Sequence, residues 1–336
     1  MGIFDRLFNR KDQSASKFET ELPRLVNVVP DKLNVQITVE KSEYAPHKGD
    51  LLCYRTFGLQ NLGQKELILA IENKSQKYQT WEPILQFFAT VYQLALDKQF
   101  VNHGDITQFG KAGILEWMGI LYVDLLPNPE QLESPRLAMI LLHPEEVEIV
   151  RNFGSLRMMS LLGQKYSYFP CPVWSDIDRK QGWTKKITAS SILSRVGARL
   201  TLPAANITKE GDGLVLRIPE SVRMDGLPNE SWILNNPLAI ILSLNPNADA
   251  CLTWPFDSHL GPKAISPEGS NGQRIGGCFL LILTQPGQDE VRLVEDGFSL
   301  VIKESTASIL WECLSQRRDM RVPVQRDALE FSLSWE

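Results

Sequence analysis

Strand-length apolar runs recur along the whole chain, with turn residues between them. Glu66–Ile71, Leu137–Leu142 and Leu238–Leu244 are nearly continuous apolar runs of this kind, which is typical of strands buried on both faces. Over residues 81–98 the pattern changes, because apolar residues recur there every three or four positions after Thr80, a residue suited to an N-cap. This mixture of periods predicts an α+β fold.

The chain has 336 residues, more than the roughly 150 of a typical domain. We therefore expect two packed lobes, each a mixed or antiparallel sheet with flanking helices. Residues 1–20 are expected to form a flexible amphipathic lead-in, residues 21–195 an α+β lobe and residues 196–336 a strand-rich α+β lobe. The turn-rich, charged stretch 173–200 favours a boundary near residue 195.

Other segments have clear local signals. Pro144 and two glutamates favour a helix that ends before Gly154. Further predicted helices are Leu156–Leu162 and Ser305–Arg317, and further predicted strands are the segment around Val35–Val39, Gly119–Leu125, Tyr166–Pro172, Gly213–Ile218, Gly277–Thr284, Val291–Ile302 and Leu329–Trp335.

Composition excludes several classes of protein. Hydrophobic residues make up 43% and charged residues 22% of the chain, which excludes a disordered tail or a collagen. The net charge of −5 with mixed signs disfavours nucleic acid as a partner. Five scattered cysteines predict reduced thiols in a cytoplasmic protein. No apolar run reaches the about 20 residues of a transmembrane helix.

The first eleven residues have an amphipathic pattern. Ile3, Phe4, Leu7 and Phe8 fall on one side of a helix. Two interpretations follow, a peptide in weak peripheral contact with a membrane or partner, and a helix docked on its own domain. The short stripe favours the docked helix.

Two groups of residues have a catalytic or metal-binding alternative. His143 and Glu146 place an imidazole near a carboxylate, and Cys171 would be a nucleophile if His143 or His103 served as its base. A strand end followed by a helix explains the first group without a metal, and a core thiol explains Cys171. We predict no metal and no cofactor.

Four of the eight tryptophans fall in predicted loops, and exposed aromatic residues are typical of binding surfaces. These are Trp174, Trp183, Trp232 and Trp254, whereas Trp81, Trp117, Trp311 and Trp335 are predicted in the core. Asp176, Asp178 and Arg179, beside Trp174, are expected to form a solvated turn, with a salt-bridged contact between the lobes as the alternative. The predicted binding surface is a cleft between the lobes near Trp174, Asp176, Asp178 and Trp183.

Three segments carry a family resemblance. They are YRTFGLQNLGQKELILAIE (Tyr54–Glu72), LRMMSLLGQKYSYFPCPVWS (Leu156–Ser175) and VEDGFSLVI (Val294–Ile302). Their GL…GQ.E, LG..Y...PCP and VEDG patterns resemble, in the same order, the C-terminal domain of the Smad-anchor FYVE proteins, the SARA and endofin family. The zinc-binding FYVE finger needs CxxC pairs that this sequence lacks, so its functions are not carried over.

The first half is also similar to the suppressor of fused (SUFU) domain. The shared pattern is an aromatic-x-x-Phe-Gly-Leu start at Tyr54–Leu59, an apolar strand, Trp81 opening a helix, and Gly104-Asp105 after it. This second resemblance covers about residues 50–180.

The resemblances imply a standalone, non-catalytic protein-interaction module that is not an enzyme and whose partner is another protein. A first alternative is a SUFU-like immunity protein that neutralises a cognate toxin. A second alternative is a hydrolase that uses Cys171 or the His143 and Glu146 pair.

Overall fold

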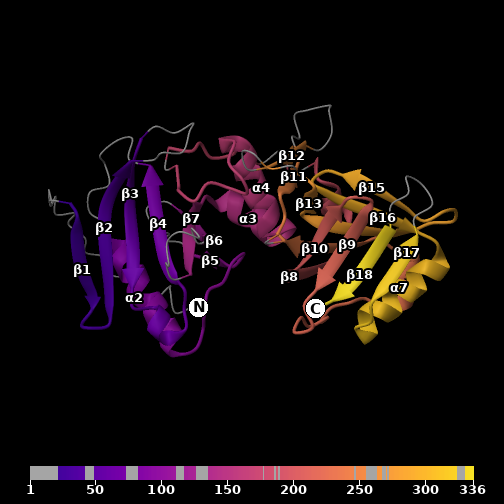
Figure 1. The fold of residues 1–336 in the computed structure, drawn as a ribbon, viewed down its shortest axis with the longest axis horizontal. Coiled ribbons are helices and arrows are strands. Elements are labelled where there is room, and N and C mark those ends of the chain that lie inside the picture. The colour runs from indigo at the N-terminus through magenta and orange to yellow at the C-terminus, as the bar shows by residue number, and fades with distance from the viewer. Residues whose placement is uncertain are drawn as a thin grey trace. The chain divides into compact units, whose positions relative to one another are not determined.

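Figure 1 shows the computed structural model, which describes residues 22–41, 49–72, 82–110, 117–125, 135–176, 178–184, 187, 190–245, 247–254, 263–266, 270, 272–323 and 330–336. Contacts divide the chain into two compact units. The first comprises Met1–Val147 and Val173–Gly182, and the second Glu148–Pro172 and Trp183–Glu336. Both units combine a sheet with helices, which confirms the α+β class. The lobe limits at residues 195 and 196 stay a prediction.

The first unit is built on a seven-stranded sheet. Its strands lie in the order β1-β2-β3-β4-β7-β6-β5 and pair antiparallel, except for the parallel pair of β4 and β7. The bounds are β1 Arg24–Val29, β2 Leu33–Lys41, β3 Asp50–Phe57, β4 Glu66–Glu72, β5 Ile106–Gln108, β6 Gly119–Leu125 and β7 Arg136–Leu142, with a 3₁₀ turn η1 at Gln60–Leu62.

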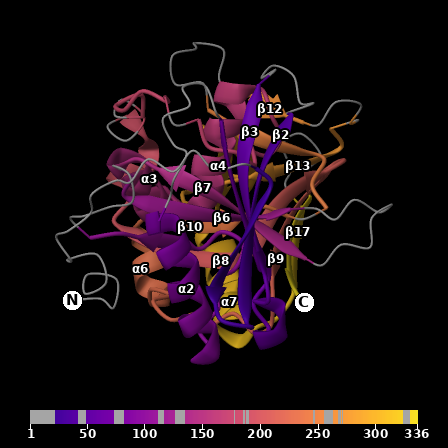
Figure 2. The ribbon, with the colours of Figure 1, turned by 90° about the vertical axis from the view of Figure 1, so that its left-hand side faces the viewer.

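Helix α2 (Glu82–Leu96) covers one face of this sheet, as Figure 2 shows. Its buried residues Ile84, Phe88, Val91 and Ala95 recur at helical spacing and pack into the core formed by the strands. The helix predicted over residues 81–98 is therefore confirmed, while Trp81 and Thr80 lie outside the described residues. Every residue of β4 is buried, as the continuous apolar run predicts.

The second unit contains an eleven-stranded sheet with the path β12-β11-β13-β8-β10-β14-β16-β15, to which β8 also joins β9, β18 and β17. Its core lies between these strands and the helices α6 (Glu230–Asn235) and α7 (Glu304–Gln316). The bounds are β8 Ala198–Glu210, β9 Gly213–Ile218, β10 Leu238–Ser243, β11 Ala250–Thr253, β12 Lys263–Ile265, β13 Arg274–Gly277, β14 Phe279–Thr284, β15 Glu290–Val294, β16 Gly297–Ile302, β17 Met320–Pro323 and β18 Glu330–Trp335, with a 3₁₀ turn η2 at Ile192–Arg195.

Two helices follow β7 along the chain. Helix α3 (Pro144–Phe153) ends before Gly154, as predicted, because Gly154 has a φ of +89° that continues no right-handed helix. The first stretch of the first unit ends at Val147 and the second unit begins at Glu148, so residues of α3 belong to both units. Helix α4 (Ser155–Tyr166) begins directly afterwards. Among the helices that the structure describes, none is both long and apolar enough to cross a membrane.

Two sequence predictions were wrong in this region. The segment Tyr166–Pro172 is not a strand, because α4 runs on to Tyr166 and is ended by Ser167 with a left-handed φ of 52°. The segment Val291–Ile302 is not one strand but the hairpin of β15 and β16, because the chain turns at Glu295 and Asp296. Glu295 has a φ of 53°, which a continuous strand does not allow.

Candidate functional site

Arg179 holds the segment 173–182 onto β7 and the first turn of α3. Its Nε donates to Glu146 Oε1 at 2.8 Å, and its Nη2 donates to Glu146 Oε2 and to the Leu141 carbonyl oxygen, both at 2.7 Å. Arg179 is 4% exposed and Glu146 is fully buried. The prediction of a solvated turn was therefore wrong for Arg179. Its charge is balanced inside the protein by the Glu146 carboxylate, which accepts two hydrogen bonds from the guanidinium.

His143 and Glu146 have structural partners within the same cluster. The His143 backbone N–H donates to Glu146 Oε2 at 2.9 Å, which caps the start of α3. The imidazole stacks on Trp117, with ring centroids 3.9 Å apart. Its Nε2 lies 2.8 Å from the Arg179 carbonyl oxygen, which only accepts, so Nε2 carries the proton. These contacts support the strand-to-helix interpretation of the pair.

The segment between these anchors presents a short exposed tip. Asp178, Lys180 and Gln181 are exposed on either side of the buried Arg179, and we call these three residues the loop tip. The Gly182 N–H donates to the Glu145 carboxylate, and the Ser175 Oγ accepts from the Leu141 N–H at 2.9 Å. A loop that is fixed at both ends and exposed at its tip suits recognition of a partner, since little ordering entropy remains to be lost.

The four predicted binding residues lie in different environments. Trp174 is 1% exposed, so its side chain offers almost no surface. Asp176 is half-buried and accepts from the Asp178 N–H at 3.0 Å. Trp183 is half-buried in the second unit, where the Lys165 ammonium lies 4.8 Å from its ring centroid. The contribution of these four residues to binding, and the cleft between the lobes, stay predictions.

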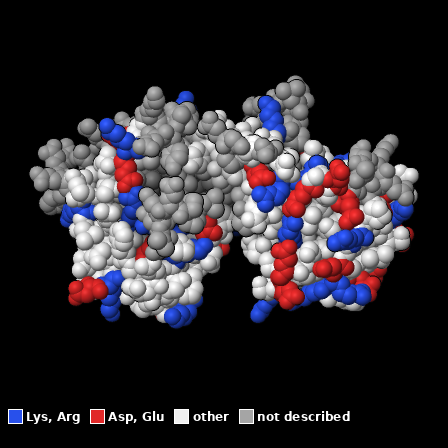
Figure 3. All heavy atoms as spheres, viewed as in Figure 1, with Lys and Arg blue, Asp and Glu red and all other residues white. Residues whose placement is uncertain are grey.

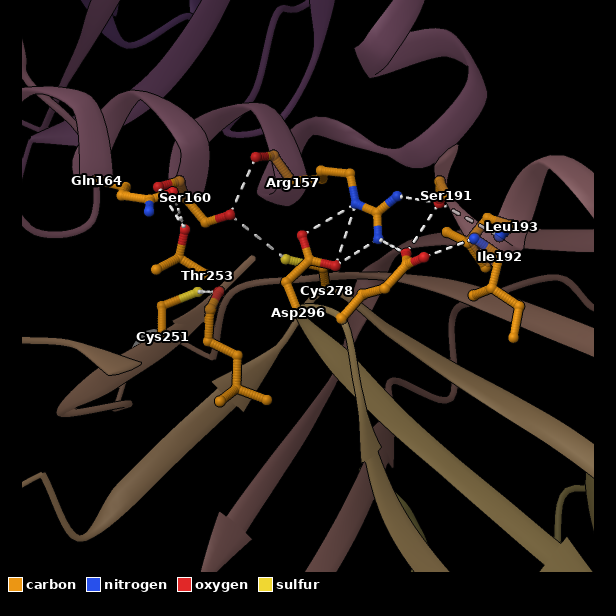
Figure 4. A network of polar contacts seen from close by, with 12 residues as sticks. Arg157, Ser160, Gln164, Ser191, Ile192, Leu193, Cys251, Thr253, Cys278 and Asp296 are labelled. Atoms are coloured by element: carbon orange, nitrogen blue, oxygen red, sulfur yellow. Dashed lines mark hydrogen bonds and ion pairs between the residues drawn. The ribbon is translucent and has the colours of Figure 1, made fainter. Parts of the chain in front are cut away.

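A second buried arginine lies in the second unit, at the hairpin of β15 and β16. Figure 4 shows the Arg157 guanidinium, which comes from α4, pointing at the Asp296 carboxylate. Arg157 Nε donates to Asp296 Oδ2 at 2.9 Å, Nη2 to Glu295 Oε2 at 2.7 Å and Nη1 to Ser191 Oγ at 2.7 Å. Arg157 and Asp296 are both fully buried, so this cluster fixes the hairpin turn on α4.

The charge of Arg157 persists despite its burial. Desolvation favours the neutral guanidine, but the carboxylates of Asp296 and Glu295 outweigh it and raise the pKa of Arg157. The rings of Phe153 and Phe279 lie 5.0 and 5.4 Å from the guanidinium carbon, and aromatic faces attract such a cation. Arg157 is therefore a permanent cation that binds two acidic side chains.

The first resemblance segment, Tyr54–Glu72, also holds structural contacts. Glu66 accepts from Thr56 Oγ1 at 2.6 Å and from the Gly58 N–H at 2.8 Å. A Cβ on Gly58 would lie 2.0 Å from the Lys32 carbonyl oxygen, so only glycine fits there. The Gln64 side chain accepts a hydrogen bond from the Val101 N–H through Oε1 at 2.8 Å. Its Nε2 donates to the Val101 carbonyl oxygen at 3.1 Å. The GL…GQ.E pattern therefore specifies a turn.

The LG..Y...PCP pattern has a similar explanation. A Cβ on Gly163 would lie 2.3 Å from the Pro170 carbonyl oxygen, because the chain after α4 folds back onto that helix. Tyr166 and Cys171 are buried. Together with Arg157 and the VEDG turn, these residues are parts of the scaffold.

Cys171 shows the properties of a core thiol. It is fully buried, and burial raises the pKa of its thiol, so little nucleophilic thiolate forms at neutral pH. All five cysteines are buried and unpaired with one another. In the described ranges, no three His, Cys, Asp or Glu side chains are placed to hold a metal ion. The geometry thus gives no support to the hydrolase alternative at Cys171 or at His143 and Glu146.

The comparison with protein families confirms the resemblance to Smad anchors. The family model described as Smad anchor for receptor activation-like, C-terminal, matches residues 132–194. This stretch contains Arg157 and Arg179, which are buried, and the loop tip.

Two curated relatives extend the similarity over most of the chain. Zinc finger FYVE domain-containing protein 16 of Mus musculus is 29% identical over 289 residues, 80% of this chain and 19% of that protein. Zinc finger FYVE domain-containing protein 9 of Homo sapiens is 24% identical over 301 residues, 80% of this chain and 20% of that protein. The chain therefore spans about a fifth of the length of these relatives.

Two solved structures are similar to this chain at a lower sequence identity than these relatives. The crystal structure of Drosophila Suppressor of Fused has 9% sequence identity and a TM-score of 0.36, covering 90% of this chain and 88% of that one. A Sufu-Fu complex has 10% identity and a TM-score of 0.34, covering 46% of this chain and 79% of that one.

We expect His103 to make the stability of the first unit depend on pH. Its Nδ1 accepts the Asp124 N–H at 2.9 Å, an interaction that protonation of Nδ1 would abolish. Burial lowers the pKa of His103 below its ordinary 6.5, the Asp124 and Asp105 carboxylates oppose this and the Lys65 ammonium adds to it. The folded state therefore disfavours the proton more than the unfolded state does.

We expect the His103 contribution to be complete above about pH 6.5 and to be lost as the pH falls toward its folded-state pKa. In His103→Asn, the amide oxygen can replace Nδ1 but does not titrate. The melting temperature of this variant should therefore change less than that of the wild type between about pH 7 and pH 5. Equal changes in both proteins would contradict the assignment.

Proposed function

We propose that this chain is a non-catalytic protein-interaction module that binds another protein through the loop tip of Asp178, Lys180 and Gln181. The observation that carries this proposal is the anchoring of the tip by Arg179, which is buried against Glu146 while its neighbours on both sides are exposed. Such an arrangement gives a small polar surface of fixed shape.

The similarity to the Smad-anchor family supports a binding role. The matched family is described as an anchor, and its match to residues 132–194 includes the loop tip. Both signs of charge lie at the tip, and on the face that Figure 3 shows, acidic and basic side chains are interspersed over the second unit. A surface of this kind suits a partner with matching polar groups more than a uniform polyanion.

Reversing charges at the loop tip should abolish capture of the partner. We expect Asp178→Arg combined with Lys180→Glu to remove the partner in an affinity pull-down from the native host, because both side chains are exposed and their signs would oppose the matching groups. The melting temperature should stay nearly unchanged, since neither side chain is in the core.

A matched control is Asp97→Arg, which reverses an exposed charge in the first unit away from the loop tip. It should retain the partner at wild-type stoichiometry. Capture that survives the double reversal would reject the loop tip as the binding surface. If the captured protein is toxic when expressed alone, the immunity-protein alternative gains support. The cytoplasmic location stays a prediction.

A further inference from the structure

Strand β15 lies at one end of the larger sheet with an open edge. In the described part of the chain it pairs with β16 alone. Leu293 on this strand is 56% exposed. The strand contains no proline and its pairing with β16 has no bulge, so two of the usual protections of an edge strand are missing.

The backbone groups that face the open edge follow from the pairing of β16. The Asp296 carbonyl oxygen accepts from Cys278 N–H, and the Ile302 carbonyl oxygen accepts from Gln285 N–H. The backbone N–H and C=O groups of the even-numbered residues of β16 therefore point toward β14, and those of the odd-numbered residues point toward β15. Because residues 297, 299 and 301 pair with residues 294, 292 and 290, the N–H and C=O groups of Val291 and Leu293 point to the open edge.

The charges of β15 are self-complementary. Glu290 and Arg292 are two residues apart, so their side chains share a face, and they form an ion pair within the strand. Two antiparallel copies of β15 centred on Val291 would place each Glu290 opposite Arg292 of the other copy. Centring on Leu293 instead would place Arg292 opposite Val294 and form no such pair. The charges thus favour one register.

We propose that a second copy of this chain docks on β15, so that two sheets join through antiparallel strands centred on Val291. The two Val291 residues exchange backbone hydrogen bonds across the twofold axis. Glu290 and Arg292 of both copies form a ring of alternating charge, at non-hydrogen-bonded positions where Cα atoms are about 4.5 Å apart. The exposed side of Leu293 lies at the same edge and loses contact with water.

Charge reversal tests the register by sedimentation velocity of the full chain over a range of concentrations. Glu290→Arg and Arg292→Glu each place like charges opposite each other twice, so each should dimerise roughly tenfold more weakly than the wild type. An equimolar mixture of the two variants should restore dimers, because opposite charges then face each other. A wild type that stays monomeric, or a mixture that restores nothing, would overturn the proposal.

Cysteine cross-linking tests the same register without altering charge. Val291→Cys places two thiols at directly opposed positions, where the Cα separation of about 5.5 Å permits a disulfide. Diamide oxidises the two thiols to one disulfide and is itself reduced to the hydrazine, so covalent dimers should accumulate on a non-reducing gel. Leu293→Cys, which faces residue 289 of the other copy, should give few.

The wild-type chain is the control for background, since its five cysteines are buried. Cross-linking of Leu293→Cys at the level of Val291→Cys, or none in either variant, would contradict the docking of a second copy in this register. The cross-linking result decides the question even if a charge variant fails to fold.

Discussion

Replacing Arg157 with alanine should destabilise the second unit by about 3–5 kcal/mol, because it leaves two acidic side chains without their buried cation. Asp296 is fully buried and Glu295 Oε2 lies 2.7 Å from Nη2 of Arg157. Hydrogen exchange followed by mass spectrometry should show faster exchange in β15, β16 and α4. Urea unfolding of the same variant measures the free energy.

Arg151→Ala is the matched control for this experiment. Arg151 also lies in the second unit and forms an ion pair with Glu148, but its side chain is 55% exposed. Its loss should cost no more than about 1 kcal/mol. Equal effects of the two substitutions would show that burial of Arg157 contributes nothing to stability.

The second large effect is expected at Arg179. Arg179→Ala removes the guanidinium from the fully buried Glu146 and from the Leu141 carbonyl oxygen, and we expect a loss of about 3–5 kcal/mol in the first unit. The loop tip should also lose its fixed position, so limited proteolysis should cut near residues 178–181 earlier than in the wild type.

Lys180→Ala tests whether this effect belongs to the anchor or to the loop in general. Lys180 is exposed and adjacent to Arg179, so its removal should change stability by less than about 0.5 kcal/mol. Early cleavage in Lys180→Ala, or a normal cleavage time in Arg179→Ala, would argue against an anchoring role.

Segments with one dominant period were predictable from the sequence. The sequence predicts the bounds of three such elements almost to the residue: Glu66–Glu72, Gly119–Leu125 and Pro144–Phe153. Apolar runs mark the two strands, and a proline at the start and a glycine after the end mark the helix, all of which are local signals. Strand β8 was missed, because Pro203 and several polar residues interrupt its thirteen-residue length. Pairing with several other strands makes it a strand despite its weak local pattern.

The buried charges were not predictable in the same way. Arg179 lies in a charged, turn-rich stretch that predicts a solvated turn, whereas Glu295 and Asp296 fall inside a segment whose pattern predicts a single strand. Neither pattern indicates burial, since charged residues are seldom buried. Their partners are distant in sequence: Glu146 for Arg179, and Arg157 for the two acidic residues. A usable signal for Arg157 was its position among Leu156, Met158 and Met159 in a helix with few other charges, which demands an acidic partner.

The path of the chain through α3 affects how this protein can change by recombination. Neither unit is one continuous stretch, because residues 148–172 of the second unit are inserted before residues 173–182 of the first. A gene fragment cut at any single point would therefore encode at least one unit that lacks a piece. We therefore expect relatives that gain or lose this region to gain or lose both units together.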